Sequence, residues 1–482
     1  MSTPSTLGRQ IAGWFTGSVN RRILAAMLTV GGLSLVVKGT ATLKELAVAY
    51  RFGTGDAVDA FLIAFLVPSL VVNVVASSLT AAFTPVYILV RETQGVPAAN
   101  RLFGSATAGS ALLVVAVTCL LLLLTPFGLH YLGHGFDAEK LTLTRALFLL
   151  LLPIVLLNVV VTLWSAALNA EEQFAAVALA PACVPLLSLT LVLLAGRIWG
   201  IHSLALGTVF GFLAQCGVLA IALSRQGTSL VPRWAGMTPE LRQVVLQYVP
   251  MVAGAVLTSS SWVIGQAMAA MLPSGSVASL NYGNKVVAMI TEVGSMALAT
   301  AVLPHFSVMV ARRDWTAIRR TIRIYVRLIA LAAVPATVTL IFFSRMIVRL
   351  LFERGAFTET DTGLVARIQA FYLLQVPFVM VGMLFVRLAS SLQKNHILLV
   401  GAAVTLPLNV ALNLVLMRWL GVAGIALSTS MVFLVSCCYL VLSVRRALRI
   451  VERRYPQGSS LRPIEDGPLG NDTPPRQELG SG

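Results

Sequence analysis

Long apolar runs recur along the whole chain, separated by short polar segments. Twelve of them are long enough to cross a bilayer, which takes about 20 helical residues. They cover residues 23–50, 57–88, 105–126, 145–168, 174–196, 201–223, 245–271, 277–304, 324–343, 364–390, 397–417 and 421–444. The backbone of a spanning segment must satisfy its own hydrogen bonds, and a helix does so. The pattern predicts an all-α polytopic membrane protein with about 12 transmembrane helices.

The twelve predicted helices form an internal repeat. The segment "GIHSLALGT" (Gly200 to Thr208) matches "GVAGIALST" (Gly421 to Thr429), and each opens the last helix of a six-helix block. Two further pairs, including prolines 153 and 377, keep an offset of about 220 residues. Since six is even, the halves have the same orientation, as in secondary transporters with a central site. The predicted units are a cytoplasmic N-terminus (1–22), an N-lobe (23–223), a linker (224–244), a C-lobe (245–444) and a largely disordered cytoplasmic tail (445–482).

Charge adds an orientation and excludes a class of partner. The 482 residues are 57% hydrophobic and only 11% charged, with a formal net charge of +16. With the N-terminus inside, 21 of the 35 Lys and Arg residues fall on cytoplasmic segments and 8 on outer loops. This positive-inside bias predicts that both termini are cytoplasmic, and it explains the basic charge without nucleic acid. The five cysteines lie within apolar runs and suggest neither a metal site nor a disulfide framework, and no cofactor is expected.

The first predicted helix carries three charges, Lys38, Lys44 and Glu45. A charge near the bilayer centre costs roughly 3 kcal/mol on insertion scales. Lys38 lies too far into the helix to reach the interface, whereas Lys44 is nearer the outer end. Glu45 is interpreted as a counter-charge to Lys44 or to another helix. In the eighth helix Lys285 is similarly placed, and no neighbour on its own helix cancels its charge, so we expect Lys38 and Lys285 to be functional.

Polar stripes accompany these lysines at matching positions of the two halves. Asn73 and Ser77 lie on one face of the second helix with two threonines, and Asn281, Lys285 and Glu292 lie on one face of the eighth, beside Asn284. Together they predict a hydrated, net-cationic cavity between the lobes. Serine and threonine in membrane helices also serve as packing contacts, and Glu292 also suits the neutralisation of a lysine, so both interpretations stay open. The predicted substrate-binding set is Lys38, Lys44, Asn73, Ser77, Asn281, Asn284 and Lys285.

Three motifs resemble a known family. "FGTGDAVDAFLIAFLVPSL" (Phe52 to Leu70), followed by "FTPVYI", resembles the start of the MurJ/MviN lipid II flippases of the MOP exporter superfamily. "SLNYGNKVVAMITEVGSMALATAVLPHFS" (Ser279 to Ser307) is similar to that family's eighth helix, and "LFERGAFTETD" (Leu351 to Asp361) to its loop before helix ten. The similarity covers about residues 25–445.

The resemblance implies a transporter, not an enzyme, with two six-helix lobes around a V-shaped cavity. It would move a polyprenyl-pyrophosphate-linked saccharide from the inner to the outer leaflet of the bacterial inner membrane by alternating access, among membrane lipids and enzymes of envelope biosynthesis. Family arginines align with Lys38, Lys44 and Lys285, so charge is kept but bidentate phosphate binding is lost. The driving force stays open between the membrane potential and a coupled cation, and Asp59 and Glu292 are the acids to test for coupling.

Other functions stay open at this stage. The substitutions of arginine by lysine keep a flippase for exopolysaccharide or O-antigen repeat units as the alternative. A multidrug exporter of the same superfamily is disfavoured because a site for cationic drugs would favour acids. A membrane glycosyltransferase is disfavoured because the longest outer loop, about residues 344–363, is too short for a catalytic domain.

Overall fold

The computed structural model describes residues 18–133, 135–171, 173–226 and 234–454, and every regular element in these ranges is helical. The helices are α2 (Ser18–Phe52), α3 (Asp56–Gln94), α4 (Val96–Leu132), α5 (Ala138–Leu151), α6 (Pro153–Ala170), α7 (Phe174–Leu179), η1 (Ala180–Ala182), α8 (Cys183–Ala195), α9 (His202–Ser224), α10 (Pro239–Ala270), α11 (Ser276–Ala311), α12 (Trp315–Phe342), α13 (Ser344–Phe352), α14 (Glu359–Leu373), α15 (Val376–Ser391), α16 (His396–Leu420) and α17 (Val422–Arg454). These elements follow the twelve predicted spans in order. The fourth, fifth and tenth spans are each divided, into α5–α6, α7–η1–α8 and α14–α15.

The repeat appears in the local geometry of the helices. Pro153 begins α6 and Pro377 lies in the first turn of α15, positions where the missing proline N–H costs no hydrogen bond. The last helix of each half, α9 or α17, follows a glycine in the left-handed region, Gly200 with φ 54° and Gly421 with φ 60°. Only glycine adopts such a conformation without strain. The proline and the glycine that mark the beginnings of helices therefore recur at matching places in the two halves.

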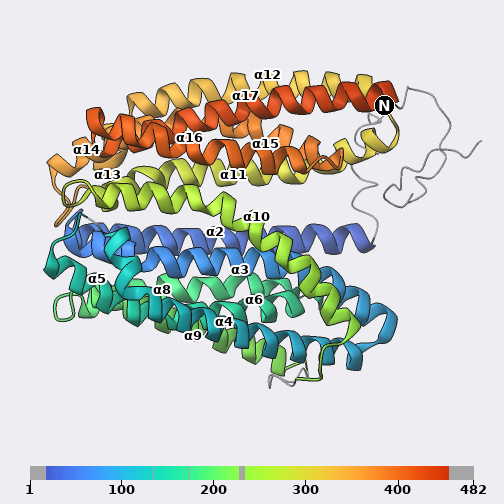
Figure 1. The fold of residues 1–482 in the computed structure, drawn as a ribbon, viewed down its shortest axis with the longest axis horizontal. Coiled ribbons are helices and arrows are strands. Elements are labelled where there is room, and N and C mark those ends of the chain that lie inside the picture. The colour runs from blue at the N-terminus through green and yellow to red at the C-terminus, as the bar shows by residue number, and fades with distance from the viewer. Residues whose placement is uncertain (1–17, 134, 172, 227–233, 455–482) are drawn as a thin grey trace, which may run out of the picture.

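The helices form two bundles lying side by side (Figure 1). We call α2–α9 the N-lobe and α11–α17 the C-lobe. Helix α10 runs obliquely between them and packs closely along α3. Its first turns contribute Leu241 and Val244 to the core of the N-lobe, whereas its last turn contributes Met268 to a core shared with α11 and α14. It therefore connects the two bundles, whereas the sequence placed residues 245–271 in the C-lobe.

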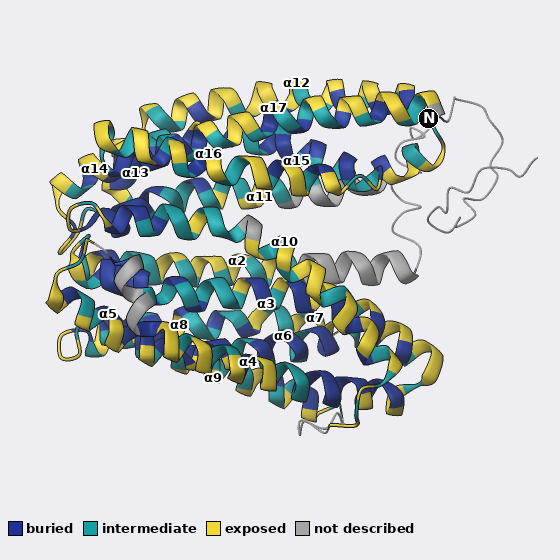
Figure 2. Cartoon of the chain, in the orientation of Figure 1, coloured by how far each residue is buried: buried dark blue, intermediate teal, exposed yellow. Residues whose placement is uncertain are grey.

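The outer faces of both bundles are apolar. Buried residues concentrate between the helices of each lobe, and large aliphatic side chains such as Leu194 (76% exposed) and Leu331 (76% exposed) point outward (Figure 2). Ten helical segments of the described chain are long and apolar enough to cross a membrane. Helices α2 and α11, which carry the predicted cavity charges, are not among these ten. The outward apolar faces are what a lipid-embedded protein presents to acyl chains.

Several helices continue beyond their predicted spans. Helix α12 begins at Trp315 rather than near 324, and α17 continues to Arg454, ten residues past the predicted end of its span at residue 444. The added turns are rich in arginine, which lowers their hydropathy without preventing helix formation. Most of the predicted N-terminal segment, residues 1–17, and the tail beyond residue 454 lie outside the described residues.

Candidate functional site

Two groups of charged side chains connect α2 of the N-lobe to α11 of the C-lobe. Lys38 forms an ion pair with Glu292, and these side chains are 46% and 57% exposed. Two helical turns further along, Glu45 accepts a hydrogen bond from Lys285 at 3.0 Å. Both helices space their partners seven residues apart, about 10 Å along each axis. We call the two contacts the inner rung (Lys38–Glu292) and the outer rung (Glu45–Lys285).

The outer rung carries an excess positive charge. Glu45 also pairs with Lys44 at 2.9 Å, so a single carboxylate serves two lysines. Including the inner rung, three lysines face two glutamates, which agrees with the expected net-cationic character. The charges of Lys38 and Lys285 are paired with acids of the facing lobe. This arrangement is compatible with the expectation that no neighbour on the same helix neutralises them. Since the backbones of α2 and α11 do not pack closely, these side chains bridge a gap between the lobes.

A cavity of about 550 Å³ opens beside the outer rung. Lys44, Glu45, Asn281 and Lys285 lie in its lining, so three of the seven predicted binding residues come together here with the counter-charge. The rest of the lining comes chiefly from the N-lobe and is mostly apolar. The polar residues among it are Asn158, Ser188, Thr208 and Gln215.

Asn158 on α6 and Gln215 on α9 were missed by sequence reasoning. Asn158 is followed on its own helix face by Thr162 and Ser165, at i+4 and i+7, and Gln215 follows Thr208 by seven residues. This spacing was the available signal, because a row of polar groups in a membrane helix is costly without partners or water. These two amides extend the polar part of the site away from the charged rungs and into the N-lobe.

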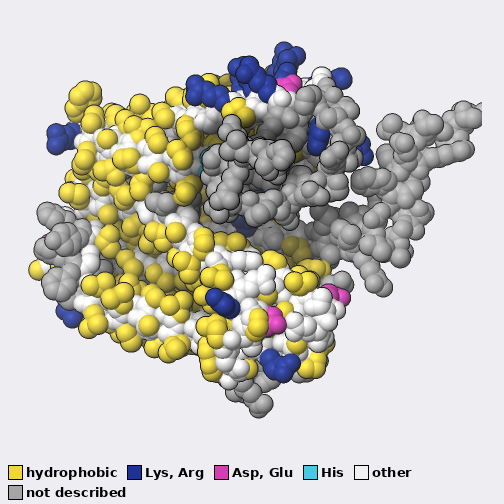
Figure 3. Space-filling view, turned by 45° about the vertical axis from the view of Figure 1, so that its right-hand side comes forward, with side chains coloured by type: hydrophobic (Ala, Val, Ile, Leu, Met, Phe, Trp, Pro, Cys, Tyr) yellow, Lys and Arg dark blue, Asp and Glu magenta, His cyan; other side chains and the backbone are white. Residues whose placement is uncertain are grey.

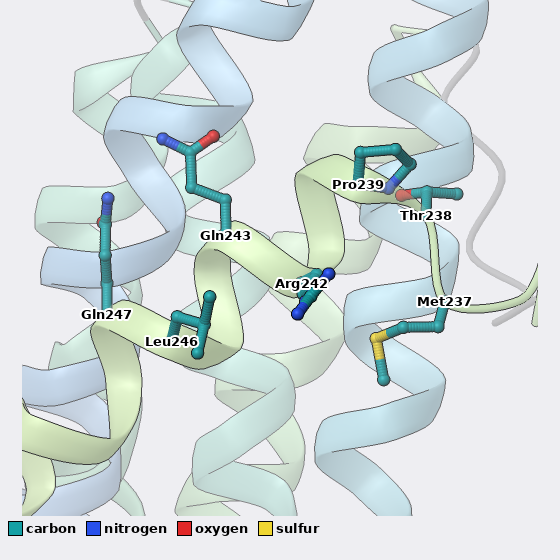
Figure 4. A pocket seen from close by; sticks show the side chains of 7 residues that line it. All are labelled: Met237, Thr238, Pro239, Arg242, Gln243, Leu246 and Gln247. Atoms are coloured by element: carbon teal, nitrogen blue, oxygen red, sulfur yellow. The ribbon is translucent and has the colours of Figure 1, made fainter.

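The remaining predicted binding residues lie elsewhere. Ser77 lines a separate hollow of about 410 Å³ formed with α10 and the start of α16, and its hydroxyl donates to the carbonyl oxygen of Asn73 at 2.7 Å. This bond to its own helix is the packing role that stayed open for serine. Asn73 is exposed and Asn284 is half-buried, and neither lines either hollow. A further hollow lies at the beginning of α10, where Arg242, Gln243 and Gln247 project from one short segment, apart from both rungs (Figure 4).

Asp59 lies at the end of the molecule where α3 begins, and it does not line the cavity although its neighbour Val58 does. It is 1% exposed, and its carboxylate accepts hydrogen bonds from the backbone N–H groups of Gly275 and Ala278, both at 2.8 Å. It thereby caps the first turn of α11 in the opposite lobe. Lys140 of α5 donates to Asp59 at 2.9 Å and to Asp56 at 2.5 Å. The predicted role of Asp59 in ion coupling stays a prediction, and its observed contacts join the lobes.

Glycines allow the lobes to approach closely at the same end. Gly275 (φ 83°) and Gly355 (φ 63°) adopt left-handed conformations, and a Cβ atom on them would lie 2.4 Å from the carbonyl oxygen of Thr54 and 2.3 Å from that of Tyr50, respectively. Ala356 N–H donates to the same Tyr50 oxygen at 2.9 Å. We call these contacts, together with those of Asp56, Asp59 and Lys140, the lobe latch. It holds the lobes together at one end of the molecule.

Comparison with known proteins places this architecture in a family. The family model described as "Lipid II flippase MurJ" matches residues 48–458, most of the chain. The chain belongs to the MurJ family. A MurJ relative named "Probable lipid II flippase MurJ", from Rhizobium tropici, is 26% identical over 84% of this chain and 78% of its own length. The "Lipid II flippase MurJ" of Burkholderia cenocepacia is also 26% identical, over 73% of this chain and 70% of its own length.

Solved structures show the same fold. A MurJ flippase in an inward closed conformation superposes with a TM-score of 0.76 at 19% identity, covering 88% of this chain and 90% of that one. An inward-facing multidrug transporter of the MATE family superposes with a TM-score of 0.72 at 14% identity, covering 88% and 99%. The predicted resemblance and fold class are confirmed. As a MurJ family member, the chain is a multi-pass protein of the bacterial inner membrane and a transporter rather than an enzyme.

Proposed function

We propose that this MurJ family member moves lipid II, a polyprenyl-pyrophosphate-linked saccharide, from the inner to the outer leaflet during peptidoglycan synthesis. Family membership supports the substrate, and relatives carrying the lipid II flippase name match across most of the chain. The observation that carries the proposal is the outer rung, where Lys44 and Lys285 from opposite lobes meet at the mouth of a cavity. Membrane enzymes of envelope biosynthesis are the proposed partners that deliver the substrate.

The outer rung suits a pyrophosphate because Glu45 already occupies an anion's place there. Its carboxylate neutralises two lysines, so an entering pyrophosphate exchanges one anionic partner for another and meets ammonium groups already held in place. Lysine binds phosphate as a point charge with freely rotating donors, which tolerates such an exchange. Asn281, Asn158 and Gln215 line the same cavity and supply hydrogen bonds for the saccharide hydroxyls. The lipid tail need not enter the cavity.

The lobe latch suggests the state of the transport cycle. We infer cytoplasmic termini from the positive-inside bias, and in that orientation the latch lies on the outer side of the membrane. The structure then corresponds to a conformation closed toward the outside. Rocking of the lobes would break the latch and expose the cavity to the outer leaflet. Pyrophosphate bound between Lys44 and Lys285 is positioned to bias this motion, because it contacts both lobes.

Substitution of the outer-rung lysine tests the proposal. Lys285→Ala should weaken the binding of a polyprenyl pyrophosphate to purified protein about tenfold or more, because the site loses its ammonium group from the C-lobe. The same variant should abolish transport of fluorescent lipid II in proteoliposomes. Lys285→Arg should retain most activity. Arg418→Ala is the matched control, because it removes a positive charge from a residue that does not line the cavity. Full transport by Lys285→Ala, or binding of polyprenyl alcohol as tight as that of the pyrophosphate, would exclude this mechanism.

A further inference from the structure

An arginine-rich groove lies between α12 and α17, outside the central cavity. One wall carries Arg319, Arg323 and Arg327 of α12, and the other carries Arg445 and Arg449 of α17. The floor is apolar, made by Ile322, Val326 and Leu448, and the groove encloses about 560 Å³. Basic side chains gather at the upper edge of the molecule in Figure 3, where acidic side chains are scarce. We call this feature the arginine groove.

The spacing of the arginines makes a continuous cationic track. On α12 they recur every four residues, which places them along one face of the helix over about 12 Å. Arg445 and Arg449 repeat the same spacing on α17. At one end of the track, Arg319 pairs with Glu452 and joins the two walls. The track is therefore longer than a single phosphate and has cations on both sides.

Most of this charge is uncompensated. Across the described chain, Arg323, Arg327, Arg445 and Arg449 form no ion pair with an acid. Arginines placed at a membrane edge only for orientation do not need to converge on a common groove. Guanidinium groups on two facing helices match phosphate oxygens in geometry as well as in charge. The groove therefore suits a multivalent anion.

The surroundings of the groove indicate where that anion comes from. Large apolar side chains beside the arginines face outward, with Ile324 52%, Leu328 57% and Leu442 56% exposed. These side chains suit contact with acyl chains, which a free phosphate does not have. The groove also lies at the end of the molecule opposite the lobe latch, near the start of α12 and the end of α17. Basic pockets between membrane helices on the cytoplasmic side are suited to acidic lipid headgroups.

We propose that the arginine groove binds the headgroup of an acidic phospholipid of the inner leaflet, preferring a lipid with two phosphate groups. The phosphates lie along the arginine track between α12 and α17, and the acyl chains rest on the flanking apolar surface. This site is separate from the cavity for the transported lipid. Because it clamps α12 to α17 within one lobe, its occupancy stabilises the C-lobe as a rigid body.

Lipid binding to purified protein tests the groove independently of transport. Native mass spectrometry would compare diphosphatidylglycerol, phosphatidylglycerol and phosphatidylcholine added to delipidated protein. We expect the two-phosphate lipid to bind most tightly. Arg323→Gln combined with Arg449→Gln, one change on each wall, should weaken its binding about tenfold or more, and the corresponding lysine pair should lose less.

The matched control is Arg320→Gln combined with Arg446→Gln. These exposed residues lie on the same two helices and remove the same charge, but they do not line the groove. We expect the control to bind diphosphatidylglycerol as the unmodified protein does. Equal weakening by both double variants would show general charge attraction and overturn the proposal. So would unchanged binding by the groove variant, or full displacement of the lipid by millimolar inorganic phosphate, which would identify the site as one for free anions.

Discussion

At the scale of single residues, the cavity is organised by one carboxylate. Glu45 lies 2.9 Å from Lys44 and 3.0 Å from Lys285, within a partly exposed site. A membrane helix tolerates such charges when they pair or face water. In the proposed mechanism the same pairing opposes substrate binding, since an incoming anion competes with Glu45 for both lysines. The affinity for pyrophosphate is then expected to depend on this acid as much as on the lysines.

Glu45→Gln tests that competition. Removing the negative charge leaves Lys44 and Lys285 free for an anion, so we expect polyprenyl pyrophosphate to bind about tenfold more tightly. Glu292→Gln changes the inner rung by the same charge and should have a smaller effect, because Lys38 does not line the cavity. Isothermal titration calorimetry on both variants provides the comparison. Weaker binding by Glu45→Gln would mean that the acid orients the lysines rather than competing for them.

At the scale of helices, the spans were predictable but their contacts were not. Hydropathy and period locate helices such as α3 and α9 within a few residues, because lipid exposure requires long apolar runs. The partners of Lys38 and Lys285 come from residues 254 and 240 positions away, and only the folded arrangement brings them together. The oblique path of α10 and the position of Asn158 and Gln215 in the cavity lining likewise depend on packing between helices. Of the predicted site, Lys44, Asn281 and Lys285 line the cavity, and Lys38, Asn73, Ser77 and Asn284 do not.

The latch glycines give a prediction at this scale. Gly355→Ala places a Cβ against the Tyr50 carbonyl oxygen, so the lobes must separate at the latch. We expect a longer distance across the latch and a larger population of molecules open on that side. Double electron–electron resonance between spin labels at positions 139 and 359 measures this distance. Gly200→Ala is the control, because Gly200 is also left-handed but has open space around its Cα. Each alanine incurs a similar backbone cost of about 1 to 2 kcal/mol. An equal change in both variants would attribute the effect to strain alone.

At the scale of the whole molecule, two bundles are joined by rungs, a latch and one crossing helix. Twelve predicted spans and a 21-to-8 distribution of basic residues predict that Thr93 faces the cytoplasm and Glu139 faces outward. In intact cells, an impermeant thiol reagent should label Glu139→Cys, while Thr93→Cys should react only after permeabilisation. Both positions are exposed, so access to the membrane side decides the result. The reverse labelling would invert the molecule and place the lobe latch in the cytoplasm.

The carboxylate of Glu45 also matters for the step of the transport cycle in which the empty carrier returns to the inner side. A flippase must return its empty site to the inner side after each delivery, and bare lysines would make that step electrostatically costly. In the proposed mechanism Glu45 and Glu292 remain beside the three lysines, so the vacant carrier keeps all but one of these positive charges neutralised. The return of the empty site to the inner side then needs no anion from the outer side, so the carrier does not transport substrate back into the cell. In this view the direction of transport depends on Glu45, which replaces the substrate's pyrophosphate as the partner of the lysines while the empty carrier returns.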